Sequence, residues 1–123
     1  MYALDTTLRK LQAFLGAAAT TTNPTVTVVY HDVSQTAKPD FSEYRRAPQF
    51  TVLSGTTETD ILASPGQGIV RHIDSITIFQ DDTVNATVTV VIDDNATNRV
   101  LVKHTLTPDQ TMFYEHGYGW DII

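Results

Sequence analysis

Residues 87–106, TVTVVIDDNATNRVLVKHTL, decide the fold class of this chain. Apolar and polar residues alternate from Thr87 to Ile92 and again from Val100 to Leu106, the two-residue period of a strand with one buried face. The polar segment between the two runs is rich in Asp and Asn. These residues favour turns because their side chains bond the local backbone and tolerate left-handed geometry. The stretch therefore predicts an antiparallel β-hairpin with its acidic loop at the rim.

Further strand-like runs, separated by turns rich in Gly, Pro and Asp, recur about every ten residues along the chain. The run at 69–80 is apolar on both faces, which predicts either a central strand or a β-bulge that switches faces. No crossover helix occurs in the second half, so a parallel α/β fold is excluded. We predict an all-β chain, a single antiparallel β-sandwich or jelly-roll domain of about eight strands spanning residues 1–123. The other predicted strands cover residues 26–30, 50–53, 60–63 and 111–114.

The start of the chain is compatible with two structures. Leu4, Leu8, Leu11 and Leu15 fit one stripe of a helix, but Leu11, Ala13 and Leu15 also alternate as in a strand. Periodicity alone does not separate the two.

Residues 32–49 show no sustained period and contain two prolines, so we predict a long surface loop or arm here. Loops beyond about 12–15 residues without their own structure tend to be functional or ordered by a partner. Bulky aromatic residues in this segment argue against simple disorder, because they gain stability when removed from water, either against their own domain or against a neighbouring subunit. We therefore predict an interface formed by four residues of the arm. They are Phe41, Tyr44, Arg45 and Arg46.

The composition argues against several classes of partner. The chain carries 8 Lys and Arg against 14 Asp and Glu, a formal net charge of -6. Nucleic-acid binding needs a clustered basic face, so we expect no nucleic-acid partner. The first residues lack the basic and apolar regions of a signal peptide, and no run of about 18 apolar residues occurs. We expect neither export nor membrane insertion, and the absence of cysteine fits assembly in a reducing cytosol.

No pattern of catalysis or cofactor binding stands out, and we predict a protein that is not an enzyme and holds no metal or cofactor. The acidic loop resembles a calcium loop, but the sixth and twelfth places from Asp93 hold Asn98 and His104 where an EF-hand needs Gly and Glu. No G-x-S-x-G nucleophile motif occurs. The histidines are scattered singly, at positions 31, 72, 104 and 116.

The order of several short motifs resembles a module found in small structural proteins of tailed bacteriophages. The segment RHIDSITIFQD at 71–81 precedes TVTV at 87–90, and TLTPDQTMFY at 105–114 precedes GYGW at 117–120. The front half, KLQAFLGAAATTTNPTVTVVYHDV and SGTTETDILASP, is similar to the front of those proteins. The likeness spans most of the chain apart from residues 34–49. It favours a strand at the start of the chain, paired with residues 26–30.

This resemblance implies a β-sandwich that is repeated many times in a virion and assembled in the host cytoplasm. The leading expectation is a head decoration or cement protein that binds the major capsid protein and forms a dimer or trimer. A neck, tail or fibre-attachment protein is the first alternative. A carbohydrate-binding adhesion module is the second, and it would expose Tyr118 or Trp120 in a groove. A Trp near the end of the chain, however, more often packs in the core.

Overall fold

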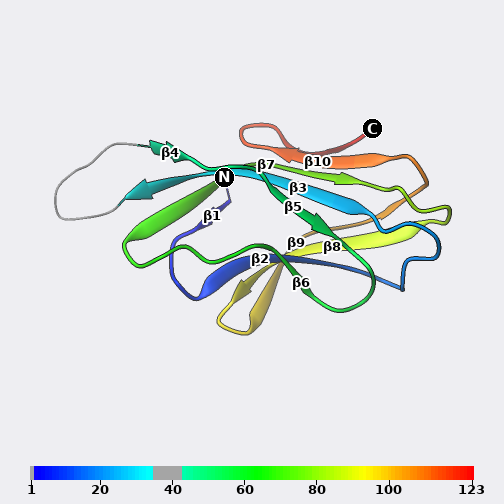
Figure 1. Ribbon diagram of the computed structural model, residues 1–123, viewed down its shortest axis with the longest axis horizontal. Helices are drawn as coiled ribbons and strands as arrows, with labels where there is room; N and C mark the ends of the chain where they lie inside the picture. Colours follow the sequence, from blue (N-terminus) through cyan, green and yellow to red (C-terminus); the bar gives the residue numbers. More distant parts are fainter. Residues whose placement is uncertain (1, 35–42) are drawn as a thin grey trace.

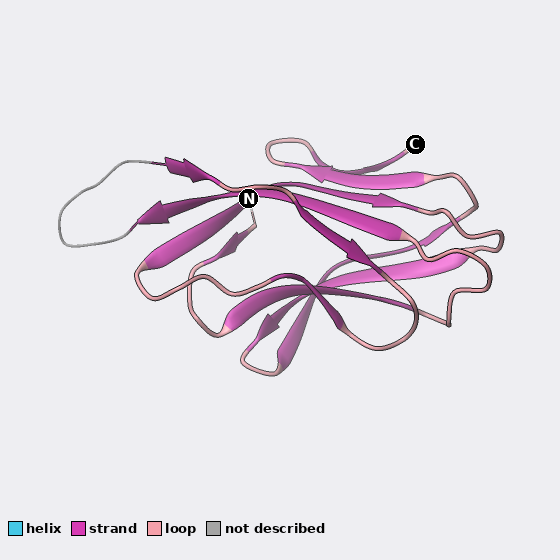
Figure 2. Cartoon of the chain, in the orientation of Figure 1, coloured by secondary structure: helices cyan, strands magenta, loops and turns pink. Residues whose placement is uncertain are grey.

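The computed structural model describes residues 2–34 and 43–123, with the side chains of 43–45 left aside. Within these residues the chain forms two antiparallel sheets that pack face to face, and every regular element is a strand (Figure 1, Figure 2). The predicted all-β sandwich is confirmed, with eleven strands where about eight were expected. In chain order the strands are β1 (Ala3–Leu4), β2 (Arg9–Leu15), β3 (Thr25–Ser34), β4 (Glu43–Arg45), β5 (Gln49–Val52), β6 (Thr59–Leu62), β7 (Ile69–Phe79), β8 (Ala86–Asp94), β9 (Thr97–Leu106), β10 (Thr111–Glu115) and β11 (Gly119–Ile122).

The large sheet has seven strands in the order β11-β10-β7-β3-β4, with β1 also paired to β7 and β5 also paired to β3. The small sheet has four strands in the order β6-β2-β8-β9. The core lies between the sheets, where alternate side chains of both inner faces are removed from water. The described part of the chain contains no helix long and apolar enough to cross a membrane.

The quoted stretch forms the hairpin of β8 and β9, as predicted. Its turn consists of Asn95 and Ala96, whose φ angles are 50° and 69°. Two successive positive φ angles in a two-residue loop are the type I′ geometry, whose twist matches that of the flanking strands. Asn tolerates this conformation, whereas Ala pays a steric cost for it.

β7 is a central strand and also contains a bulge, so both features considered for residues 69–80 are present. Opposite β3, Val29 pairs with Ser75 and Tyr30 pairs with Ile73, which leaves Asp74 as the extra residue. The bulge shifts the alternation by one place. Ile73 and Ile76 therefore both point into the core, where neither is exposed.

The start of the chain is a strand, but its predicted partner is wrong. β2 pairs with β8 and β6 in the small sheet, not with residues 26–30 of β3. The reason is that both edges of β3 are already occupied, one by β7 and the other by β4 and β5. β2 instead lies beside β8, so that the buried side chains of both strands share the inner face of the small sheet, with Ala13 opposite Val90.

The long loop predicted at residues 32–49 is also corrected. β3 continues to Ser34, β4 covers Glu43–Arg45 and β5 begins at Gln49, while residues 35–42 lie outside the described residues. Asp32, one of the polar residues that suggested a loop, can lie buried in a strand because it has two arginine partners. Its carboxylate accepts hydrogen bonds from Arg71 and Arg46.

One buried carboxylate joins two loops at the same end of the sandwich. Asp82 accepts hydrogen bonds from the backbone N–H groups of Thr20 (2.8 Å), Thr21 (2.9 Å), Thr22 (3.3 Å) and Thr83 (2.8 Å). These donors, the N–H of Thr20 foremost, lower the pKa of Asp82 to about 2. Hydrogen bonds to a carboxylate favour its ionised form. Asp82 therefore ties the loop after β2 to the loop after β7.

The turn geometry predicts that Ala96→Gly stabilises the protein. Glycine removes the steric cost of the left-handed alanine, about 1–2 kcal/mol, but makes the unfolded chain freer, which costs about 0.4–1 kcal/mol. Urea unfolding should therefore show a free energy of unfolding that is higher by about 0.5–1 kcal/mol. Ala17→Gly, at an exposed loop position without positive φ, is the matched control and should lower stability. An equal loss in both variants would contradict the turn assignment.

The lowered pKa of Asp82 predicts how stability depends on pH. When the pKa of a carboxyl is lower in the folded than in the unfolded protein, its ionised form stabilises the fold. This stabilisation is complete above the unfolded pKa and is lost as the pH falls through the folded pKa. We expect the wild type to lose stability as the pH falls from about 4 to about 2. Asp82→Asn should unfold several degrees lower at neutral pH, and its unfolding temperature should depend less on pH in this range. Thermal unfolding across pH measures both. The neighbouring exposed Asp81→Asn should keep the wild-type slope.

Candidate functional site

The outer face of the large sheet points away from the small sheet and carries a row of paired side chains across several strands. Thr25 pairs with Val52 on one side and with Phe79 on the other. Phe79 pairs in turn with Thr111, which exchanges two backbone hydrogen bonds with Ile123. Directly opposite residues share a face of the sheet, so these side chains form one continuous row.

A second row runs beside the first. Thr27 pairs with both Phe50 and Thr77, and Thr77 pairs with Phe113. The rows alternate threonine with bulky apolar residues, both of which fit the pleated surface of a strand. We call the bulky members of both rows the apolar face. It consists of Phe50, Val52, Phe79, Phe113 and Ile123.

Much of the apolar face is open to solvent. The exposed fractions are 71% for Phe50, 54% for Val52 and 75% for Ile123. A hollow of about 380 Å³ lies between β3 and β5, lined by residues 25–27 and 50–52. A group of exposed apolar side chains that crosses several strands is typical of a protein-binding surface, because scattered single residues would not form it. This arrangement can bind another protein by burial of apolar area.

The sequence contains a signal for this face, although it was not recognised as a site. Phe50 and Val52 alternate on one short strand, and Thr25 and Thr27 alternate on another. Which strands are neighbours, and which of their faces is left uncovered, depends on long-range pairing that the sequence pattern does not specify.

The four predicted interface residues belong to a different part of the molecule. Phe41 lies outside the described residues, and Tyr44 and Arg45 are described only through the backbone of β4. Arg46 is half exposed, and its Nε donates to the Oδ2 atom of Asp32 over 3.1 Å. Arg46 is therefore anchored at the end of β4, and its predicted role in an interface stays a prediction.

Asp32 is the centre of a buried ion-pair network between β3 and β7. Arg71 donates from Nε to Oδ1 (2.8 Å) and from Nη2 to Oδ2 (3.1 Å), while its Nη1 donates to the carbonyl oxygen of Ala63 (2.9 Å). Burial by itself raises the pKa of Asp32, but the hydrogen bonds and positive charges of Arg71 and then Arg46 lower it below its ordinary value. The two arginines therefore supply the hydrogen bonds and opposite charge that the buried Asp32 carboxylate needs at the edge of the core.

The acidic hairpin loop and two of the histidines are engaged by neighbouring side chains. Asp94 accepts hydrogen bonds from Arg9 and Arg99, which lower its pKa, Arg9 being the larger cause. The rings of His31 and His72 stack with their centroids 5.0 Å apart, and His31 Nδ1 lies 2.8 Å from the carboxylate of Asp74. Residues 2–34 and 46–123 contain no group of three or more His, Asp or Glu placed to hold a metal ion.

The Trp predicted to pack in the core lies partly buried against it. Trp120 packs beside Tyr2 and Tyr114, and its Nε1 donates to the hydroxyl oxygen of Tyr2 over 3.0 Å. Tyr118, two residues earlier, is 85% exposed. The two aromatic residues considered for carbohydrate binding therefore differ, because only Tyr118 stands free in solvent.

No family model, curated protein or solved structure matches the chain.

The network around Asp32 predicts a large effect of Arg71→Met. Removal of the bidentate partner leaves a buried carboxylate with one remaining guanidinium, and loss of one member of a buried ion pair costs about 3–5 kcal/mol. We expect chemical denaturation to show a loss of about 3 kcal/mol. Arg99→Gln is the control, since the Arg99 side chain is 66% exposed in its pair with Asp94, and it should change stability far less. Equal effects of the two substitutions would show that burial of Asp32 is unimportant.

Proposed function

We propose that this chain is a structural protein of a tailed bacteriophage, a decoration or cement protein that binds the head shell and stabilises it. The order of the motifs at 71–81, 87–90, 105–114 and 117–120 supports the family. The two-sheet body supports a role as a rigid building block. The major capsid protein or another virion protein is the proposed partner, and the virion is the proposed location.

The apolar face is the observation that carries this proposal. Its exposed Phe50 and Val52 lie on a short strand at the border of a rigid sheet, so little conformational entropy is lost when a partner covers them. A protein present in many copies needs only a modest contact per copy, because several linked contacts act together. A dimer or trimer of the chain would present several such faces to the shell at once.

The first alternative is a component of the neck, tail or fibre attachment, which could use the same face. The number of copies in a particle separates the two roles. Hundreds of copies in a stained gel of intact virions would indicate the shell, and about a dozen would indicate the neck or tail. Detection of the protein only in detached tails would rule out the decoration role.

A carbohydrate-binding module is supported by one separate observation. Tyr118 stands beside a hollow of about 300 Å³ whose lining includes Phe113 and Trp120 together with the acidic residues Glu115 and Asp121. Sugars stack on aromatic rings and donate hydrogen bonds to carboxylates. This role predicts binding to host-cell glycans that is lost in Tyr118→Ala while the protein stays folded.

The decoration role predicts that Phe50→Asp impairs attachment to the head. Purified wild-type protein should bind heads that lack it and raise the temperature at which they open, whereas the substitution should weaken binding by about tenfold or more, since a charge on an apolar contact must be desolvated. Sedimentation of heads with bound protein measures the affinity. Leu8→Asp is the matched control, because Leu8 is 57% exposed and lies outside the apolar face. Undiminished attachment of Phe50→Asp would reject this face as the contact.

A further inference from the structure

The flank of the sandwich opposite β6 carries a long strand with one free edge. β9 pairs with β8 from Leu106 opposite Ala86 to Thr97 opposite Asp94, with a bulge at Leu101 between the pairs Val102–Val90 and Val100–Val91. Its other edge has no strand partner in the described part of the chain. β9 is 10 residues long and contains no proline, so its outward N–H and C=O groups are available as a template for another strand.

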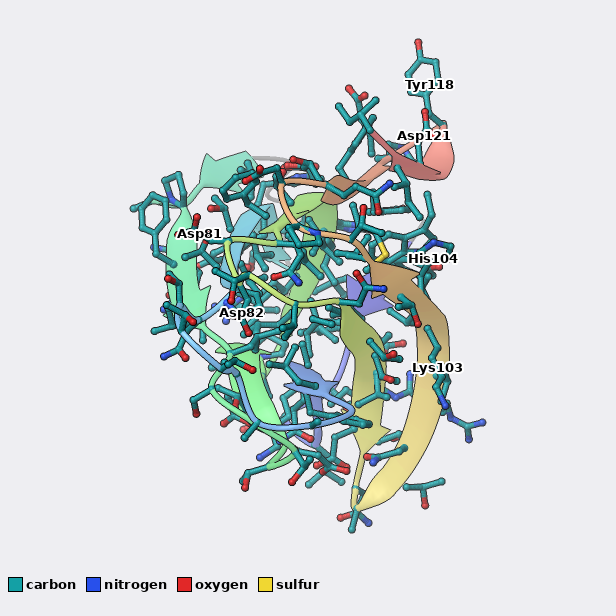
Figure 3. The ribbon with its side chains drawn as sticks, turned by 90° about the vertical axis from the view of Figure 1, so that its right-hand side faces the viewer. Asp81, Asp82, Lys103, His104, Tyr118 and Asp121 are labelled. Carbon is teal, nitrogen blue, oxygen red and sulfur yellow. The ribbon has the colours of Figure 1, made fainter. Side chains whose placement is uncertain are left out.

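An apolar groove accompanies this free edge. The inner face of β9 contributes Val102 and His104 to a hollow of about 280 Å³. The facing edge of the large sheet contributes Met112, Trp120 and Ile122, together with the acidic Asp121. The two sheets are not joined at this flank, so the inner side of β9 is only partly covered. Figure 3 shows Lys103 and His104 projecting from β9 along one side of the molecule, below Asp121 and Tyr118 of the β10–β11 hairpin.

The charge of β9 differs from that of the chain as a whole. The strand carries Arg99, Lys103 and His104 and no acidic residue, in a chain with net charge -6. Arg99 is paired with Asp94, while Lys103 is exposed and has no ion-pair partner among the described residues. Lys103 projects on the outer face of the small sheet, since it pairs with Thr89 rather than with a core position.

We propose that β9 binds an extended, acidic segment of a partner protein by strand addition. The added strand continues the small sheet through backbone hydrogen bonds to the free edge of β9. Every second side chain of the added strand enters the groove. We expect these side chains to be apolar, because they cover Val102, Trp120 and Ile122. The side chains between them lie on the face that carries Lys103, so acidic residues there are favoured.

The charge pattern disfavours a second copy of this chain as the occupant of the edge. In a two-fold antiparallel pairing of β9 with itself centred on Lys103, the Lys103 side chains of the two copies lie directly opposite each other. Like charges directly opposite each other destabilise a strand pair. Other two-fold registers still place the two Lys103 side chains on the same face of the joined sheet. An acidic partner strand avoids this repulsion and neutralises Lys103.

A pair of synthetic peptides tests the proposal. The probe has the length of β9, with valine at every second position and aspartate between, blocked termini and a fluorescent label; the comparison peptide has lysine in place of aspartate. We expect fluorescence anisotropy at low salt to show about tenfold tighter binding of the aspartate peptide. Amide hydrogen exchange, followed residue by residue by NMR, should slow in β9 when that peptide is bound.

Charge reversal at the edge provides the decisive variant. Lys103→Glu should abolish the preference for the aspartate peptide. The double variant Thr56→Glu and Gln67→Glu lowers the net charge equally at two exposed positions away from β9, and it should keep the preference. This comparison separates a local contact of Lys103 from the effect of total charge.

Three results would overturn the proposal. The first is equal affinity for both peptides, or no binding up to about 1 mM. The second is slower exchange in another strand instead of β9. The third is slow exchange in β9 without peptide together with dimers in sedimentation, which would make a second copy the occupant. None of these depends on the phage assignment, because the test uses the purified chain alone.

Discussion

Burial of apolar side chains between the two sheets is the interaction on which the rest of the molecule depends. Ile73, Ile76 and Ile78 of β7 belong to the same cluster as Leu11 and Val90 of the small sheet, and none of the five is exposed. The bulge at Asp74 makes this possible, because without it Ile73 and Ile76 would point to opposite faces. Both candidate binding surfaces are held in place by this core, one on the outside of β7 and β3, and the other along the flank.

The sequence predicts those parts of the fold that depend on local pattern. Alternation and turn chemistry are sufficient for the hairpin at 87–106. Two-sided apolarity narrows residues 69–80 to a central strand or a bulge, and the structure contains both. The partner of β2 is not predictable in this way, since many alternating strands could satisfy it. The role of Asp32 is also missed, because the guanidinium that makes its burial possible lies far along the chain at Arg71. The same limit applies to the candidate site: Phe50 and Phe79 become neighbours on one face only through the pairing of β3 with both β5 and β7.

The two surfaces suit different kinds of contact. The apolar face is broad and lacks a charged centre, so it fits a flat partner that is recognised mainly by apolar burial. The flank is narrow and directional, with a backbone template beside a groove and a basic residue next to it, so it fits an extended segment. A rigid scaffold that offers both can hold a folded partner and a strand at the same time, without rearrangement of its core.

The hydrogen bond between Trp120 and Tyr2 has a consequence for biosynthesis. It joins the first strand of the large sheet to the last, since β1 pairs with the same edge of β7 as β10, and β10 pairs in turn with β11. During translation Tyr2 is synthesised before Trp120, so the hydrogen bond between them and this sheet are completed only after β11 has been made. Until then β10 lacks its partner strand β11, and the unpaired edge of the nascent polypeptide is open to chaperones and to misassociation with other unfinished chains.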